Sequence, residues 1–190
     1  RPILAVTLVI FSCGSAFAEV EADNSGTNPA VLNLSAAISN EYRSLDSEFY
    51  YNVASLKYTE PFVDGRASVR LHVPVGATDL VPGDEVGLGD VGVKLSYIPY
   101  VDRSFGLILS NEVSAPAASE DVPGSGKWTT SPGVVLAAFL GPEIILAPAY
   151  VHTFSFAGDG DRGDINIGTF DLYAVCKPRG ERWRLTADFT

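Results

Sequence analysis

The fold is indicated most clearly by the stretch RASVRLHVPV (residues 66–75), in which polar and apolar side chains alternate. Its odd-numbered positions hold Ala, Val, Leu, Val and Val, and its even-numbered positions hold Arg, Ser, Arg, His and Pro. Successive side chains of a β-strand point to opposite faces, so this stretch predicts a strand with one apolar and one polar face.

The same period of two recurs along the rest of the chain, and no long amphipathic helix is evident. We expect about nine strands, most of roughly ten residues or more, where globular strands average ~5–6 residues and transmembrane strands need ~9–11. The first of these is equally compatible with a short helix, because its periodicity is mixed. The expected strands are residues 35–44, 48–59, 66–75, 90–97, 105–114, 127–139, 143–156, 165–175 and 182–189.

The connections between these strands alternate in length from residue 60 onward. Long connections at residues 77–85, 115–126 and 157–164 are separated by short ones. Outer-membrane barrels have short periplasmic turns and longer extracellular loops. The sequence therefore predicts an all-β protein, an antiparallel up-and-down transmembrane β-barrel, with its three long loops outside the cell.

Composition narrows the class of protein further. The chain of 190 residues is 46% hydrophobic and 19% charged, which is atypical of a disordered chain. Its 13 Lys and Arg against 23 Asp and Glu leave a net charge of −10, whereas nucleic-acid-binding proteins carry basic patches. We therefore expect no nucleic-acid partner.

The N-terminus has the pattern of an exported protein. The apolar run ILAVTLVIF (residues 3–11) is too short to cross a bilayer as a helix, and Ala16-Phe17-Ala18 resembles a cleavage site. We expect a signal peptide at residues 1–18, truncated at its start, a flexible periplasmic lead-in at 19–34, and a partial barrel at 35–190. The absence of Met and the odd strand number predict a fragment of a longer protein from a Gram-negative outer membrane.

Charged residues on the polar faces of the strands are expected to line the barrel lumen, where charge sets solute selectivity. Mutual pairing that merely fills the interior is an equally open interpretation. The residues expected to line the lumen are Arg66, Arg70, Asp90, Lys94, Glu112, Lys127, Arg182, Arg184 and Asp188.

Four motifs could indicate a nucleotide, phosphate, calcium or catalytic site. Their spacing or their place in the predicted strands argues against each of these sites. GLGDVG (residues 87–92) precedes a strand, whereas a dinucleotide fingerprint opens a helix, so its glycines indicate curvature or a bulge. GSGKW (residues 124–128) departs from a phosphate loop, and its Trp128 is typical of an interfacial aromatic girdle. GDGDRGD (residues 158–164) lacks EF-hand spacing. His152 and Ser155 face opposite sides of a strand. We expect no catalytic residue, no metal site and no cofactor.

Several segments, taken in order, resemble one family of outer-membrane proteins. They are GDV (residues 89–91), EVSAPAA (112–118), GSGKW (124–128) followed by Pro132-Gly133, FSFAGD (154–159), and WRLT (183–186). In this order they are similar to segments of a family of transporter-like outer-membrane barrels. That family takes its name from the meta-pathway of phenol degradation. The resemblance implies an outer-membrane barrel that moves small hydrophobic or aromatic compounds, and it brings no catalytic residues.

The expected function is therefore an outer-membrane channel or transporter that works by passive diffusion, with the lipid bilayer and small solutes as its partners. Three alternatives stay open. They are a closed structural or adhesive barrel that presents loops, an outer-membrane lipid-modifying enzyme that uses His152, and a soluble periplasmic β-sandwich. The sequence does not specify the oligomeric state.

Overall fold

The computed structural model describes residues 6–11, 29–45, 49–78, 85–118, 124–141, 143–176 and 185–189. Side chains are described for residues 29–42, 50–77, 86–118, 124–141 and 143–176. The strands are β1 (Val6–Phe11), β2 (Ser35–Leu45), β3 (Phe49–Phe62), β4 (Ala67–Thr78), β5 (Glu85–Leu88), β6 (Val91–Val101), β7 (Phe105–Ala115), β8 (Lys127–Leu140), β9 (Ile144–Gly158), β10 (Asn166–Cys176) and β11 (Leu185–Phe189).

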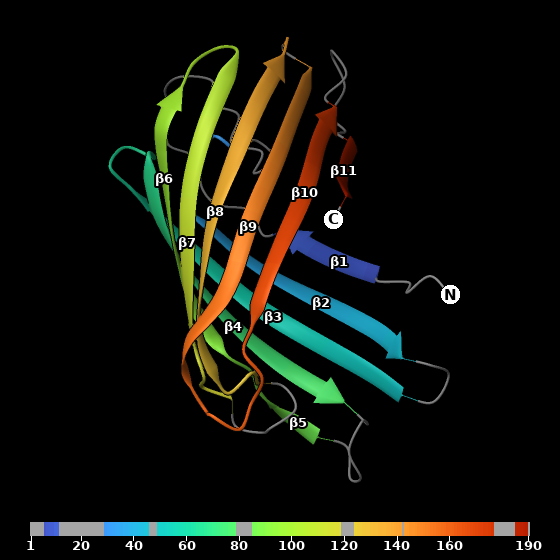
Figure 1. Ribbon diagram of the computed structural model, residues 1–190. Coiled ribbons are helices and arrows are strands. Elements are labelled where there is room, and N and C mark those ends of the chain that lie inside the picture. The colour runs from blue at the N-terminus through green and yellow to red at the C-terminus, as the bar shows by residue number, and fades with distance from the viewer. Residues whose placement is uncertain are drawn as a thin grey trace.

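These strands form one antiparallel sheet that curls into a half-barrel (Figure 1). Consecutive strands pair in the order β1-β2-β3-β4-β6-β7-β8-β9-β10-β11, while β5 pairs with β4. The expected all-β, antiparallel, up-and-down arrangement is confirmed, and all nine expected strands are present. The ambiguous first segment is strand β2, and the described strands make a single sheet and not the two packed sheets of a sandwich.

Two strands lie where none was expected. Strand β1 falls within the expected signal peptide and pairs with β2, from Val6 opposite Tyr42 to Phe11 opposite Ala37. The signal peptide remains a prediction. Strand β5 falls at the end of the expected long connection at residues 77–85, so the undescribed part of that connection is residues 79–84.

Strands β5 and β6 run along the same neighbour, β4, with an irregularity between them. Leu88 lies opposite Val75, but Gly92 lies opposite His72, so the register shifts by one residue across Gly89 and Asp90. The Gly89 amide still donates a hydrogen bond to the Pro74 carbonyl, at 2.9 Å. One extra residue in one strand is the defining feature of a β-bulge, and the GLGDVG motif is therefore a bulged strand.

The hollow of the half-barrel contains a small apolar cluster formed by buried Ala30, Ile98, Ile108, Ala137 and Ala147. Ala30, which is only 7% exposed, belongs to the expected flexible lead-in, and the end of that segment is thus packed inside the sheet. The Ala30 Cβ lies 3.1 Å from the position that a Cβ on Gly106 would take. The cluster also explains why Ile108 interrupts the polar face of its strand, because it buries against Ala30.

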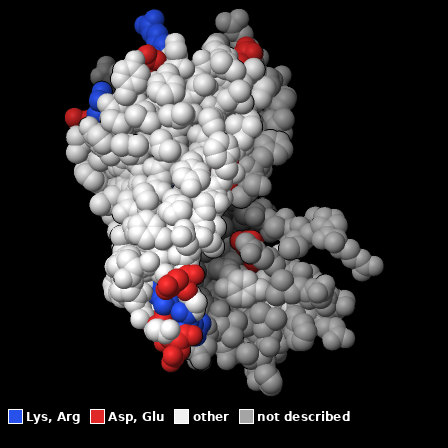
Figure 2. Space-filling view, viewed as in Figure 1, with Lys and Arg blue, Asp and Glu red and all other residues white. Residues whose placement is uncertain are grey.

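The outer face of the sheet is apolar. Figure 2 shows a broad uncharged surface over the strands, with charged side chains mainly at its two ends. In contrast to the seven buried apolar residues, 27 large apolar side chains among the described residues are exposed. Examples from the middle of their strands are Leu56, Leu71, Leu95, Leu109 and Leu136. A contiguous apolar surface on this scale is atypical of a soluble monomer.

Aromatic pairs lie on the outer face near both ends of the strands. The rings of Trp128 and Phe156 are 6.4 Å apart beside the long loops. At the other end, the rings of Tyr100 and Phe105 are 6.3 Å apart. Such paired bands flank the apolar belt of membrane barrels.

The turn between β6 and β7 is organised by Asp102. Its Oδ1 accepts hydrogen bonds from the amides of Ser104 (2.7 Å) and Phe105 (2.8 Å), and its Oδ2 accepts one from the Tyr100 hydroxyl (2.5 Å). These bonds, with the tyrosine hydroxyl first, hold the pKa of the Asp102 carboxyl below its ordinary value.

Candidate functional site on the concave face

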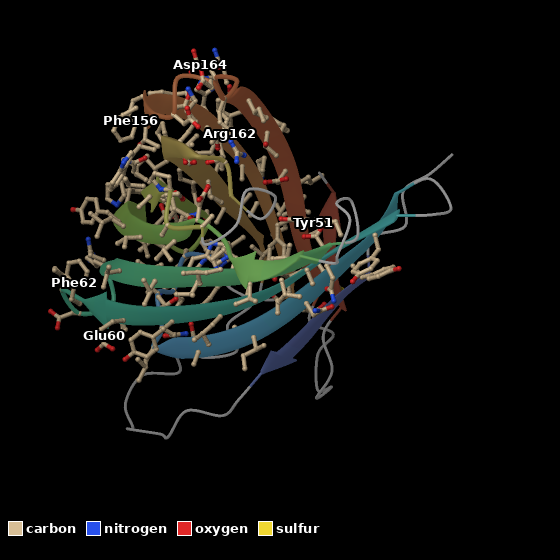
Figure 3. All side chains as sticks on the ribbon, turned by 90° about the horizontal axis from the view of Figure 1, so that it is seen from below. Tyr51, Glu60, Phe62, Phe156, Arg162 and Asp164 are labelled. Atoms are coloured by element: carbon tan, nitrogen blue, oxygen red, sulfur yellow. The ribbon has the colours of Figure 1, made fainter. Side chains whose placement is uncertain are left out.

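Figure 3 looks along the half-barrel and separates its two faces. Phe62 and Phe156 lie on the outer side of the curved sheet, whereas Arg162 points toward the hollow. Because side chains alternate along each strand, these positions fix which residues face inward. We call the inward-facing side the concave face.

Five charged or titratable residues from neighbouring strands gather on the concave face, and we call them the inner charged patch: Lys57, Arg70, His72, Lys94 and Glu112. Lys57 lies opposite His72 between β3 and β4. Arg70 lies opposite Lys94 between β4 and β6, and Lys94 lies opposite Glu112 between β6 and β7. The sheet register alone therefore brings these residues together.

Short hydrogen bonds hold part of the patch in place. The Arg70 Nε donates to the Thr59 Oγ1 at 3.0 Å, and the Ser55 Oγ lies 3.2 Å from the His72 Nε2. The other ring nitrogen of His72, Nδ1, is 3.5 Å from the Glu112 Oε1. His72 is thus fixed between a hydroxyl on one side and a carboxylate on the other.

Gly92 makes room for the carboxylate of Glu112. A Cβ built on Gly92 would lie 2.5 Å from the Glu112 Oε1 and 3.2 Å from the Ser114 Oγ. Real side chains do not approach so closely, so the Glu112 side chain occupies space that only a glycine leaves open at this position.

Beside the patch, a group of contacts fastens the long loops to the barrel wall. The Asp90 Oδ2 accepts hydrogen bonds from the amide of Ser125 at 2.7 Å and from its hydroxyl at 2.5 Å. The Lys127 Nζ lies 3.0 Å from the Asp164 Oδ1. We call the Asp90–Ser125 and Lys127–Asp164 contacts the loop latch, because each joins a long loop to a residue far away in the sequence, Asp90 in the bulge before β6 and Lys127 at the start of β8.

The ion pair of the loop latch has one buried and one exposed partner. The Lys127 side chain is 8% exposed, and that of Asp164 is 87% exposed. The hydrogen bond and charge of Lys127, followed by a bond from the Ser155 hydroxyl, hold the pKa of the Asp164 carboxyl below its ordinary value. The same loop also reaches the long loop before β8 through Arg162, which donates to the Gly124 carbonyl at 3.0 Å.

The structure brings together only some of the residues expected to line the lumen. Arg70, Lys94 and Glu112 share the concave face, whereas Asp90 and Lys127 belong to the loop latch. The other four residues do not join them in the described part of the chain. Arg66 is exposed in the turn before β4, Arg182 and Arg184 lie outside the described residues, and Asp188 is described only by its backbone pairing with Tyr173.

Lys57 and His72 complete the patch but are absent from that expected set. Both could have been found from the period of two. His72 lies on the polar face of residues 66–75, and Lys57 shares its face with Ser55 and Thr59 on the preceding strand. What no periodicity reveals is that Lys57 and His72 are direct neighbours across two strands.

His152 and Ser155 have separate environments. The His152 ring packs beside Tyr150 and Phe154, with centroids 6.3 and 5.8 Å away, while the Ser155 hydroxyl donates to Asp164 and accepts from the Ile165 amide. Three residues apart on a strand, the two side chains face opposite ways, as the sequence predicts. Across the described part of the chain, no group of three or more His, Cys, Asp or Glu residues could hold a metal ion.

Comparisons of the chain with family models, with characterised proteins and with solved structures found no match. Within the described residues, no helix has the length and apolar character needed to span a membrane.

Proposed function

We propose that this chain is part of a Gram-negative outer-membrane β-barrel that lets small solutes diffuse through its lumen. The observation that carries the proposal is the distribution of side chains on one curved sheet. Large apolar residues such as Leu71 are exposed on its outer face, while Arg70, Lys94 and Glu112 lie on the concave face. This pattern reverses that of a soluble protein and matches a barrel with lipid outside and water inside.

The strand lengths agree with this proposal. Strands β2 to β4 and β6 to β10 contain 11 to 15 residues, enough for a tilted strand to cross the ~30 Å hydrocarbon core. Aromatic pairs near both ends of the sheet support the same placement. The preference for small hydrophobic or aromatic solutes rests on the family resemblance of segments such as EVSAPAA (residues 112–118).

A closed barrel that presents loops is the second candidate, and one observation favours it. The apolar cluster around Ala30 and Ile108 occupies part of the hollow, and a filled lumen would not conduct solutes. The two candidates predict different behaviour of a folded barrel in a membrane.

Liposome swelling with the purified full-length protein distinguishes them. A conducting barrel lets small neutral sugars and phenols enter, so the vesicles swell in proportion to the protein added. Vesicles without protein, and vesicles with heat-unfolded protein, provide the baseline. If a barrel that is folded by circular dichroism admits no solute, the channel proposal is wrong and the filled barrel is favoured.

A further inference from the structure

We propose that the inner charged patch makes the lumen selective for small anions, which it attracts through Lys57, Arg70 and Lys94. This inference rests on the proposed channel function and adds the charge class of the solute. It follows from the balance of charge on the concave face, from the placement of like charges beside one another, and from the partners that these charges have.

The charge of the patch is opposite in sign to that of the chain. Lys57, Arg70 and Lys94 carry three positive charges against the single carboxylate of Glu112, a local excess of two, whereas the chain as a whole has a net charge of −10. A water-filled passage lined by one sign of charge concentrates mobile ions of the opposite sign. The patch therefore favours anions in a protein whose overall charge repels them.

Among the described residues, Glu41 and Asp171 of the concave face lie away from the patch, and Asp90 lies beside it in the loop latch. By alternation, Glu41 faces inward and lies opposite Val53, which is four residues from Lys57 along β3, or about 14 Å. Asp171 lies on β10, several strands away, opposite Ala149 of β9. The separation of Glu41 from Lys57 exceeds the Debye length of about 8 Å at physiological ionic strength. With Asp90 counted beside Glu112, the three cations still leave an excess of one positive charge.

Two positive charges of the patch face each other directly. Arg70 and Lys94 occupy opposite positions of an antiparallel pair, where side chains approach closely and like charges are destabilising. The charge of Lys94 is stabilised by the Glu112 carboxylate and opposed by both Arg70 and Lys57. A mobile anion held between these groups would relieve the repulsion that the protein chain leaves in place.

The cations of the patch are poorly compensated by the protein. The Glu112 carboxylate is 3.5 Å from His72, and Arg70 is bonded to the hydroxyl of Thr59, which is neutral. Among the described residues, neither Lys57 nor Lys94 has a hydrogen bond or an ion pair shorter than 4.0 Å. No described protein group therefore holds either ammonium group in a direct bond, and both side chains are half-buried on the concave face.

The test measures ion selectivity of the full-length protein in planar lipid bilayers. With a tenfold gradient of potassium chloride, the reversal potential gives the ratio of chloride to potassium permeability, and potassium acetate in place of the chloride extends the measurement to a carboxylate. We expect anions to be favoured, and each of Lys57→Gln and Lys94→Gln to lower the ratio by about two- to fivefold. Glu112→Gln should raise it.

The matched control is Arg103→Gln, which removes the same charge from the exposed turn between β6 and β7 and should leave the ratio unchanged. Heat-dependent gel mobility confirms that every variant folds. Conductance whose ion ratio is the same in all variants overturns this inference alone. A folded barrel without any conductance overturns the channel proposal and this inference together.

Discussion

Replacing Leu71 with arginine tests whether the outer face of the sheet lies in lipid. Leu71 is 43% exposed and lies between Tyr58 of β3 and Val93 of β6, in the outer apolar surface. It is four residues from the start of β4 at Ala67. With a rise of ~3.4 Å per residue and a tilt of ~40°, this places it about 10 Å from the end of the strand, near the centre of a ~25 Å apolar band.

The expected cost follows from this depth. An arginine on the lipid face costs ~2–4 kcal/mol at the bilayer midplane and ~0–1 kcal/mol near the interface, so Leu71→Arg should lower the free energy of unfolding by about 2–3 kcal/mol. The matched control is Leu140→Arg, because Leu140 is 54% exposed and is the last residue of β8. It should cost about 1 kcal/mol or less.

The assay is equilibrium unfolding in urea of the full-length protein in phospholipid vesicles, followed by tryptophan fluorescence and approached from both the folded and the unfolded state. The expected difference between the two variants, about 2 kcal/mol, changes the folding equilibrium roughly thirtyfold. Exposed positions in water usually tolerate substitution within ~0.5 kcal/mol. Equal, small losses for both variants would refute the placement of this face in lipid.

Three further predictions concern the concave face and the loop latch beside it. Gly92→Ala should lower the free energy of unfolding by about 1 kcal/mol. The new methyl would lie 2.5 Å from the Glu112 Oε1, so the flexible Glu112 side chain would have to move. Ile108→Ala should lower it by ~2–4 kcal/mol by opening a cavity in the buried cluster. For the ion pair of Lys127 with Asp164, the folded-state pKa of the carboxyl lies below its unfolded value of ~3.9, so its stabilising contribution is complete above that pH. This contribution is lost as the pH falls through the lower pKa that Asp164 has in the folded state. Protease cleavage of the loop after β9 should therefore begin only at that acidic pH.

Each of these has a control and an outcome that contradicts it. Gly160→Ala places a methyl where nothing lies within 4 Å, and a loss equal to that of Gly92→Ala would remove the steric explanation. Leu109→Ala truncates the exposed neighbour of Ile108 and should cost less. Asp164→Asn should make cleavage of the loop independent of pH, and cleavage of the unaltered loop that begins at neutral pH contradicts the ion-pair argument.

The strands and their faces were predictable from the sequence because the direction of a side chain is a local property of an extended backbone. The alternation at residues 66–75 identified both β4 and its polar face, and the glycines at 87–92 indicated a bulge. Strand β5 was missed because it adds only four residues to the far side of that bulge. The interruption at Ile108 had no explanation in the sequence, since the residue that covers it, Ala30, is 78 positions earlier.

The sequence by itself therefore determined which residues form strands and which of them share a face. The tertiary structure decided which of those residues meet. The sheet register places Arg70 opposite Lys94 and not opposite an acidic residue. The long loops bring together residues far apart in the sequence: Asp90 with Ser125, 35 residues apart, and Lys127 with Asp164, 37 residues apart. The physical reason is that the face to which a side chain points is set by the local extended backbone. The residue that lies opposite it on the next strand is set by the register and curvature of the whole sheet.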